Sequence, residues 1–132
     1  MIVIETSALV AIIQGEPEHA VFAQAVAEAE HRYLPASCYV ETVMVLRSRV
    51  DGRSLLERFL RDFEVEIFGS DPAQARIAAD AFERFGRGSG HPAKLNFGDC
   101  LAYAAAAALG APLLFKSGDF AQTDIRPAAL PA

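Results

Sequence analysis

The sequence has little of what disulfide-rich, zinc-binding or membrane proteins need. Its two cysteines, Cys38 and Cys100, lie far apart and outside any CxxC or Cys/His spacing, whereas a zinc site or a disulfide framework requires more ligands or closer spacing. No apolar run reaches the roughly 18–20 residues that span a bilayer. The acidic Glu5 follows directly after residues 1–4, where a signal peptide carries basic residues. We therefore expect a cytoplasmic protein without a membrane partner.

Positive charge is also scarce. The chain has 12 Lys and Arg against 17 Asp and Glu, a net charge of −5, which excludes a protein that coats nucleic acid by bulk charge. An enzyme that acts on nucleic acid through a local metal site remains compatible with this balance. With 52% apolar residues in 132, the chain favours one folded domain over residues 1–132.

The hydrophobic pattern predicts short strands alternating with helices, which is typical of an α/β fold around a parallel sheet. Ligands of such sheets bind at the carboxyl ends of the strands, near the point where the strand order reverses. Thr6 or Ser7 is expected to cap the first helix and Ser37 the third. The expected strands cover residues 1–4, 33–34, 65–68 and 113–115, and the expected helices 6–13, 17–29, 37–50, 53–62, 71–85 and 96–110.

Two acids lie where this rule expects a ligand-binding site, either just after an expected strand or in the helix that follows one. Glu5 follows the first expected strand directly, although a solvated acid beside a helix N-terminus would occupy the same position. Glu41 is the only charged residue between Arg32 and Arg47. Burial of an acid in so apolar a stretch is costly unless it is paired or binds a metal. A surface acid on an exposed stripe is the alternative for Glu41.

The other two acids lie at the start of the last expected helix and after the last expected strand. Asp99 stands three residues after Asn96, so it fits a capping box as well as a functional position. Asp119 follows the fourth strand and could be an ordinary turn residue. If these two acids converge with Glu5 and Glu41, their hard carboxylate oxygens suit Mg²⁺ or Mn²⁺ and phosphoryl transfer. Spacing alone leaves that convergence open.

Four segments carry a resemblance to a known family. Together they resemble PIN-domain proteins and, more narrowly, VapC-type toxins of bacterial type II toxin–antitoxin systems, over nearly the whole length. The resemblance implies a three-layer α/β/α domain with a central parallel sheet of four or five strands. The segments are MIVIETSALVAI (1–12), the helix that contains Glu41, KLNFGDCLAY (94–103) and LLFKSGDF (113–120).

The resemblance also implies an activity and partners. It implies an endoribonuclease that requires Mg²⁺ or Mn²⁺, acts on RNA that in some members is tRNA or ribosomal RNA, and is held inactive by a VapB-like antitoxin. Homodimers are common in the family, and operator DNA would be bound only through the antitoxin. Carried over by position, the catalytic acids are Glu5, Glu41, Asp99 and Asp119, with Glu5 and Asp99 on the metal and Thr6 and Ser7 supporting the first acid.

Two departures from the family pattern bear on activity. Glu5 stands where the family normally has Asp, and one added methylene moves the carboxylate by roughly 1–1.5 Å, while Mg²⁺ tolerates little departure from octahedral geometry. We therefore expect weakened metal binding and reduced cleavage. The alternative is an impaired protein that mainly binds antitoxin and takes part in operon autoregulation. Gly118 replaces the first of two polar positions, which puts the catalytic role of Asp119 in doubt.

Several positions are expected to contact RNA or a partner. Arg87 and Lys94, in a glycine-rich loop expected to be flexible, and Lys116 could bind phosphates, or could be ordinary surface charge. Apolar residues in 9–13 and 21–26 could form a groove for an antitoxin helix or belong to the core. The alanines of 102–108 favour close helix packing.

Overall fold

The computed structural model describes residues 1–132. Its four strands form one all-parallel sheet in the order β3-β2-β1-β4, which confirms the predicted α/β class with four strands. The elements are β1 (Ile2–Ile4), α1 (Thr6–Gln14), α2 (His19–Glu28), β2 (Arg32–Pro35), α3 (Ala36–Val45), α4 (Gly52–Asp62), β3 (Val65–Phe68), α5 (Pro72–Phe85), α6 (Phe97–Leu109), β4 (Leu113–Leu114) and the 3₁₀-helix η1 (Phe120–Gln122).

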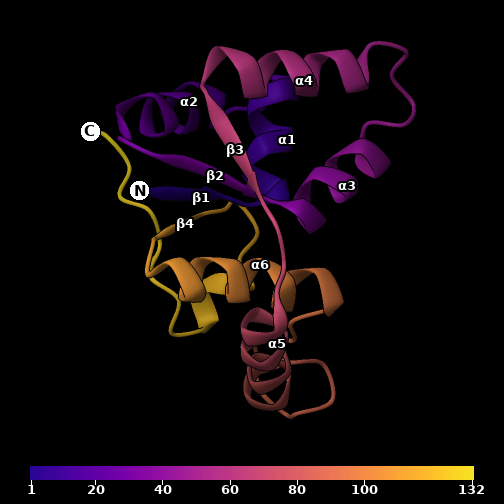
Figure 1. Ribbon diagram of the computed structural model, residues 1–132, viewed down its shortest axis with the longest axis vertical. Coiled ribbons are helices and arrows are strands. Elements are labelled where there is room, and N and C mark those ends of the chain that lie inside the picture. The colour runs from indigo at the N-terminus through magenta and orange to yellow at the C-terminus, as the bar shows by residue number, and fades with distance from the viewer.

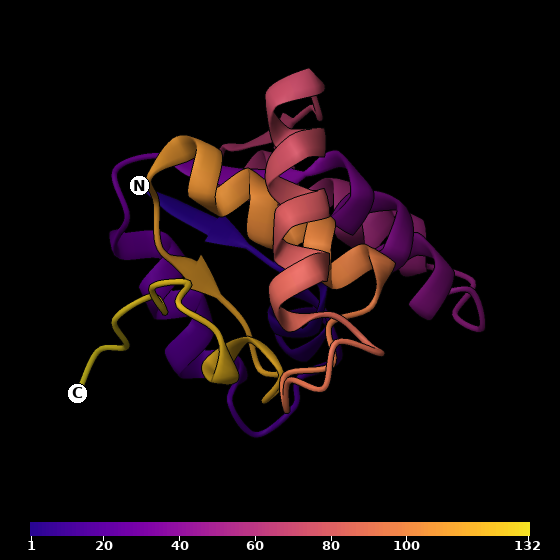
Figure 2. The same cartoon turned by 90° about the horizontal axis from the view of Figure 1, so that it is seen from below.

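Helices cover both faces of the sheet (Figure 1). Helices α1, α2 and α4 lie on one face, and α5 and α6 lie on the other. Seen from below, α5 crosses in front of α6, which lies between α5 and the sheet (Figure 2). The chain moves outward from β1 to β2 and β3 and then returns to the other side of β1 to form β4. The strand order therefore reverses between β1 and β4, and this is where α/β sheets bind ligands.

The core lies on both sides of β1. Val3, Ile4, Leu34 and Leu113 are completely buried, as expected for strands covered on both faces. Helix α6 approaches closely because its inward positions are small; they are Ala102, Ala104, Ala105 and Ala106. The prediction that the alanine-rich run serves packing is confirmed for these four residues.

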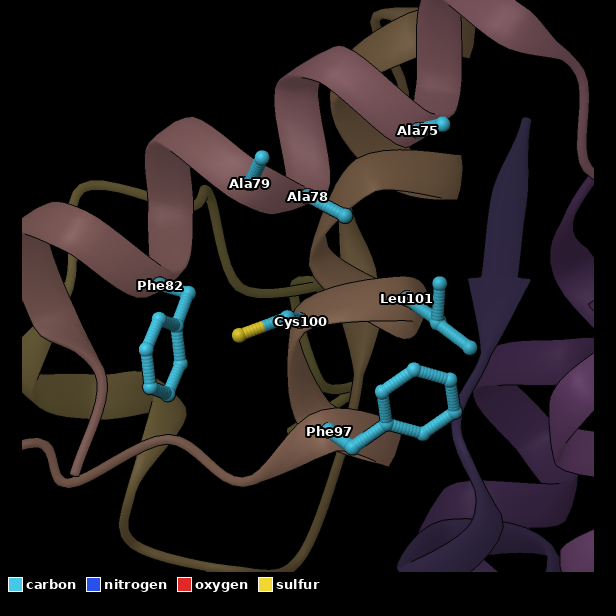
Figure 3. A pocket seen from close by; sticks show the side chains of 7 residues that line it. All are labelled: Ala75, Ala78, Ala79, Phe82, Phe97, Cys100 and Leu101. Atoms are coloured by element: carbon cyan, nitrogen blue, oxygen red, sulfur yellow. The ribbon is translucent and has the colours of Figure 1, made fainter.

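Part of the suggested antitoxin groove belongs to this core. Leu9, Phe22 and Val26 are buried, so they are not available to a partner. Ile12 and Ile13 are only partly buried and line a shallow hollow of about 210 Å³ between α1 and α4. A larger apolar hollow of about 460 Å³ lies between α5 and α6, with the rings of Phe82 and Phe97 at its sides (Figure 3).

Elements with strong local signals match the prediction at both ends. β3 spans the predicted residues, and α5 begins as expected: the Asp71 side chain accepts a hydrogen bond from Gln74 N at 2.8 Å, and Pro72 occupies the first turn. α1 ends at Gly15 in the left-handed conformation, with φ +67°. None of the helices combines the length and apolarity that crossing a membrane requires.

The caps of α1 and α3 differ from the prediction. Glu5, and not Thr6 or Ser7, caps α1 with its own side chain. α3 starts immediately after Pro35, so Ser37 is inside the helix, and it ends at Val45 instead of about residue 50. A tight turn then leads into α4. Gly52 is required there, because a Cβ would lie 2.8 Å from the Leu46 carbonyl oxygen.

Candidate functional site

Glu5 is the centre of the site. It follows β1 directly and is only 6% exposed. Its carboxylate turns back onto α1, where Ser7 N–H donates to both oxygens at 2.8 and 3.1 Å. The pKa of this carboxyl is raised to about 7: burial is the largest cause, the Ser7 hydrogen bonds oppose it, and the charges of Asp99 and Glu41 add to it. The predicted strand-tip acid is therefore a buried, hydrogen-bonded carboxylate.

Glu41 reaches the same region from α3. The Thr6 hydroxyl donates to Glu41 Oε1 at 3.0 Å, and Oε2 lies against the Cα of Gly98, where an added Cβ would overlap it. Burial raises the pKa of Glu41, the Thr6 hydrogen bond lowers it, and the nearby Asp99 raises it. Thr6 was expected to support the first acid, but its hydroxyl supports the second, because it occupies the first position of α1 and faces α3.

Asp99 combines its two predicted roles of cap and neighbour of the other acids. It forms a capping box with Asn96: Asn96 N–H donates to Asp99 Oδ2 at 3.0 Å, and Asp99 N–H donates to Asn96 Oδ1 at 2.8 Å. The other carboxylate oxygen, Oδ1, has no hydrogen-bond partner. Burial raises the pKa of Asp99, the Asn96 N–H lowers it, Asp119 raises it and Arg87 lowers it. Asp99 is therefore influenced both by another acid and by a cation of the glycine-rich loop.

Asp119 lies at the start of η1 and is exposed. It is close enough to raise the pKa of Asp99. The charges of Asp99 and Glu41 thus act on Glu5, and the charge of Asp119 acts on Asp99, so each of the four predicted acids has another of them as an electrostatic neighbour. They do not form a ready-made ligand group, since no three His, Cys, Asp or Glu side chains lie close enough together to hold a metal ion.

Ser7 connects the first acid to the loop that follows β4. Its hydroxyl accepts hydrogen bonds from Lys116 N at 2.8 Å and Ser117 N at 3.1 Å, while its own N–H binds Glu5. The Lys116 ammonium pairs with Glu16 at 2.5 Å and with Glu18 at 3.3 Å. The predicted phosphate contact of Lys116 therefore competes with two ion pairs. Ser7 contacts the first acid through its backbone N–H, and its hydroxyl contacts the loop after β4 instead.

The donor set fits a divalent cation. No lysine or arginine forms an ion pair with any of the four acids, and Arg87 acts on Asp99 only from a greater distance. Carboxylate oxygens are the ligands that Mg²⁺ and Mn²⁺ prefer. The hydroxyl of Ser37 is buried without a partner one helical turn before Glu41, where it could bind a water. Glu5 and Asp99, with Glu41 beside them, are the residues that could hold the ion.

Two residues of the site escaped the sequence analysis. Gly98 belongs to a motif that was singled out, yet its steric role against Glu41 depends on a contact between helices far apart in the chain. Ser37 was assigned to a helix cap, although its spacing of four residues from Glu41 already places both on one helix face. That spacing was the one available signal.

Comparisons with known proteins agree with the fold. Residues 2–126 match the family model described as PIN domain. The chain is 44% identical to ribonuclease VapC42 of Mycobacterium tuberculosis over 128 residues, covering 96% of this chain and 98% of that protein.

Two solved structures share the architecture. The crystal structure of Mycobacterium tuberculosis VapC20, described as a sarcin-ricin loop cleaving toxin, superposes with a TM-score of 0.76 at 17% identity and covers 99% of this chain and 100% of that one. VapBC2 of Rickettsia felis, bound to a DNA fragment from its promoter, gives a TM-score of 0.73 at 14% identity and covers 96% of each chain. With the family model matching almost the whole chain and a curated ribonuclease this similar in sequence, the chain belongs to the PIN-domain family and, within it, to the VapC ribonucleases.

Proposed function

We propose that the chain is a toxin endoribonuclease that hydrolyses RNA phosphodiester bonds with Mg²⁺ or Mn²⁺ and is neutralised by a VapB-like antitoxin in the cytoplasm. One observation carries the proposal: four carboxylates without a pairing cation gather where the strand order reverses, in a chain of the VapC family. Such a cluster attracts a divalent cation, and the cation in turn attracts phosphate. A tRNA or ribosomal RNA substrate is our expectation from the family.

The chain's residues have separate tasks in this proposal. A divalent ion would supply activation of water and neutralisation of charge on the phosphate. Glu5 and Asp99 would hold it, with Glu41 and Asp119 contributing from α3 and from the loop after β4. The Thr6 hydroxyl fixes the direction of the Glu41 carboxylate, and Ser7 N–H fixes that of Glu5.

We further propose that Glu5 weakens this activity. Both of its carboxylate oxygens lie against Ser7 N, so one lone pair of each is directed at this N–H and the carboxylate has less freedom to turn towards an ion. Aspartate at position 5 has one methylene fewer, which retracts the carboxylate by roughly 1–1.5 Å and matches the stricter geometry of Mg²⁺.

The test compares the wild-type chain with Glu5→Asp and Glu5→Gln. Calorimetric titration with Mn²⁺ and cleavage of RNA, with and without EDTA, should rank the three proteins: Asp highest, Glu intermediate, Gln lowest. Equal affinities and equal rates for Asp and Glu would refute the weakening. RNA cleavage that persists in EDTA would refute the dependence on a metal ion.

A second candidate function follows from the same residue. If Glu5 prevents metal binding altogether, the chain would act mainly by binding its antitoxin and, through it, operator DNA in operon autoregulation. No cleavage by the wild-type chain, together with full cleavage by Glu5→Asp, would favour this second function. Tight antitoxin binding is expected under both functions and does not discriminate between them.

The hollow between α1 and α4 supports an antitoxin contact. It is lined by Ile12, Ile13, Leu55, Phe59 and Phe63, with Arg58 and Asp62 at its rim. This pattern fits the apolar face of an amphipathic helix. We also propose a homodimer, supported by the exposed apolar side chains between α5 and α6.

A further inference from the structure

The glycine-rich loop between α5 and α6 is tied together by hydrogen bonds, although its composition predicts flexibility. Leu95 N–H donates to the Phe85 carbonyl at 2.9 Å, and Arg87 N–H donates to the Leu95 carbonyl at 3.1 Å, so the two ends of the loop are joined. Inside it, the Ser89 hydroxyl donates to the Gly86 carbonyl at 2.7 Å and accepts from His91 N–H at 3.2 Å. These hydrogen bonds therefore hold the backbone of the loop in a defined conformation.

This loop encloses a hollow of about 470 Å³ that offers hydrogen-bond donors and no carboxylate. Arg87 and Lys94 line it, and neither forms an ion pair with any residue of the chain. His91 contributes a third donor: its Nδ1 accepts from Ala93 N–H at 3.0 Å, so in the neutral ring the proton lies on Nε2. The remaining lining residues are Gly88, Gly90 and Pro92.

The backbone of the loop carries strain at a lining residue. Lys94 has φ +50°, a left-handed conformation that non-glycine residues rarely adopt. Such strain is retained where surrounding structure fixes it, often at a binding site. Here the bonds of Leu95 to both Phe85 and Arg87 fix it, and they hold the Lys94 side chain at the hollow.

The hollow adjoins the acidic site. Arg87 is close enough to Asp99 to lower the pKa of that carboxyl, against the larger opposing effect of burial. Lys94 stands two residues before Asn96, the cap of α6, and Asp99 lies in the first turn of that helix. The unpaired Arg87 is thus an electrostatic neighbour of the acidic site.

We propose that this hollow is a subsite for a backbone phosphate of the RNA strand, next to but distinct from the phosphate that is cleaved. The inference rests on the proposed ribonuclease function and deepens it. Arg87 and Lys94 supply charge, His91 Nε2–H supplies a hydrogen bond, and the glycines leave room for the sugar–phosphate backbone. Contacts of this kind recognise the chain of phosphates and not the bases.

The other basic residues near the site are already engaged. Lys116 pairs with Glu16 and Glu18, and Arg84 pairs with Asp124 at 2.9 Å. Binding a phosphate with them would break existing ion pairs. Arg87 and Lys94 have no such contact to lose, so the phosphate is favoured at the loop.

The test measures how RNA binding depends on salt. A fluorescently labelled single-stranded RNA is titrated in EDTA, which suppresses cleavage, at several salt concentrations. The proteins are wild type, Arg87→Ala/Lys94→Ala, and the control Arg76→Ala, which removes one exposed and unpaired charge from the far end of α5. Each phosphate contact with single strands contributes roughly 0.7 to the slope of log K against log salt, so the double variant, which removes the contacts to one phosphate, should lose about 0.7.

The outcomes separate this subsite from the function on which it rests. A slope reduced in the double variant but unchanged in Arg76→Ala supports the subsite, and in cleavage assays the same variant should then raise KM more than it lowers kcat. An unchanged slope, or an equal loss per charge in Arg76→Ala, overturns the subsite while the ribonuclease function stands. Failure of the wild-type chain to bind or cleave RNA overturns both.

Discussion

The direction of one carboxylate depends on the absence of a side chain at Gly98. Glu41 is held between the Thr6 hydroxyl on one side and the Gly98 backbone on the other. A methyl group at position 98 would overlap Oε2, which is the far end of a flexible side chain. The carboxylate would therefore move while the fold persists, so Gly98 acts as a positioning residue.

We predict that Gly98→Ala lowers RNA cleavage by roughly 10–100-fold, because a displacement of about 1 Å in a catalytic group has effects of this size. The melting temperature should change little. Cleavage rates at saturating metal and thermal unfolding, measured on the same samples, check both parts. Gly69→Ala is the matched control, since a Cβ there meets nothing within 4 Å.

A shorter acid provides the decisive comparison. Glu41→Asp draws the carboxylate away from position 98, so Gly98→Ala should cost much less activity in that background than in the wild type. Independent losses that simply add would show that Gly98 does not act through Glu41.

At the residue scale, the four acids could be predicted from the sequence but their contacts could not. Glu5 and Asp119 follow expected strands, Asp99 stands near the start of an expected helix, and Glu41 is the only charged residue in an apolar stretch. That Glu5 caps its own helix, and that Thr6 binds Glu41, depends on how α1 and α3 meet. No local pattern contains that information.

At the scale of the elements, one acidic residue, Asp124, holds the segment after β4 against α5 and α6. Asp124 accepts a hydrogen bond from the Tyr103 hydroxyl of α6 and pairs with Arg84 of α5. The hydrogen bond from Tyr103 is the largest cause that lowers the pKa of Asp124 below its ordinary 3.8. Burial acts in the opposite direction, and the contacts with Arg84 lower the pKa further. The same bond, after burial, raises the pKa of Tyr103 to about 12.

Because the folded pKa of Asp124 is depressed, its contribution to stability is present above the unfolded value and is lost as pH falls through the folded one. Asp124→Asn should lower Tm by about 4 °C near pH 7, equivalent to about 1 kcal/mol for a half-exposed charged contact. The difference should shrink below pH 3.8. Thermal unfolding across pH checks this, and a difference independent of pH would contradict it.

Elements were predictable where their signals are local. α5 has Asp71 and Pro72 at its start, and α6 has the Asn96 capping box, so both starts were correct. The start of α3 was misassigned because Pro35 leads directly into the helix without a side-chain cap. Its early end depends on the turn at Gly52, which is set by packing against Leu46.

At the scale of the whole molecule, the α5–α6 face is an apolar surface that the chain itself leaves uncovered. Phe97 is 79% exposed and Phe82 48% exposed, and both border the hollow in Figure 3. Apolar side chains gathered in this way indicate an interaction surface. We assign it to a second copy of the chain, in line with the proposed homodimer.

Phe97→Glu should convert the dimer to a monomer, since it places a charge at the centre of an apolar contact. Light scattering coupled to size-exclusion chromatography gives the mass directly. Val50→Glu, at a fully exposed position on the turn between α3 and α4, should leave the dimer intact. A wild-type chain that is monomeric at micromolar concentration would refute the assignment.

The sequence predicted the fold class because strands and helices alternate along the chain and a known family pattern covers it. It did not reveal this face, because Phe82 and Phe97 have the same local pattern as core residues. Whether an aromatic side chain faces the core or a partner is decided by how α5 packs on α6.

The position of β1 in the sheet has a consequence for when the sheet can be completed during synthesis. β1 pairs on one side with β2 and on the other with β4, which lies near the carboxyl end of the chain. During synthesis Glu5 emerges among the first residues, yet the strand that precedes it keeps an open edge until residues 113–114 follow. Long-range pairing of this kind forms late. A chain that ends before β4 lacks one neighbour of β1, so we expect the acids of this site to take their places only after these late residues have been made.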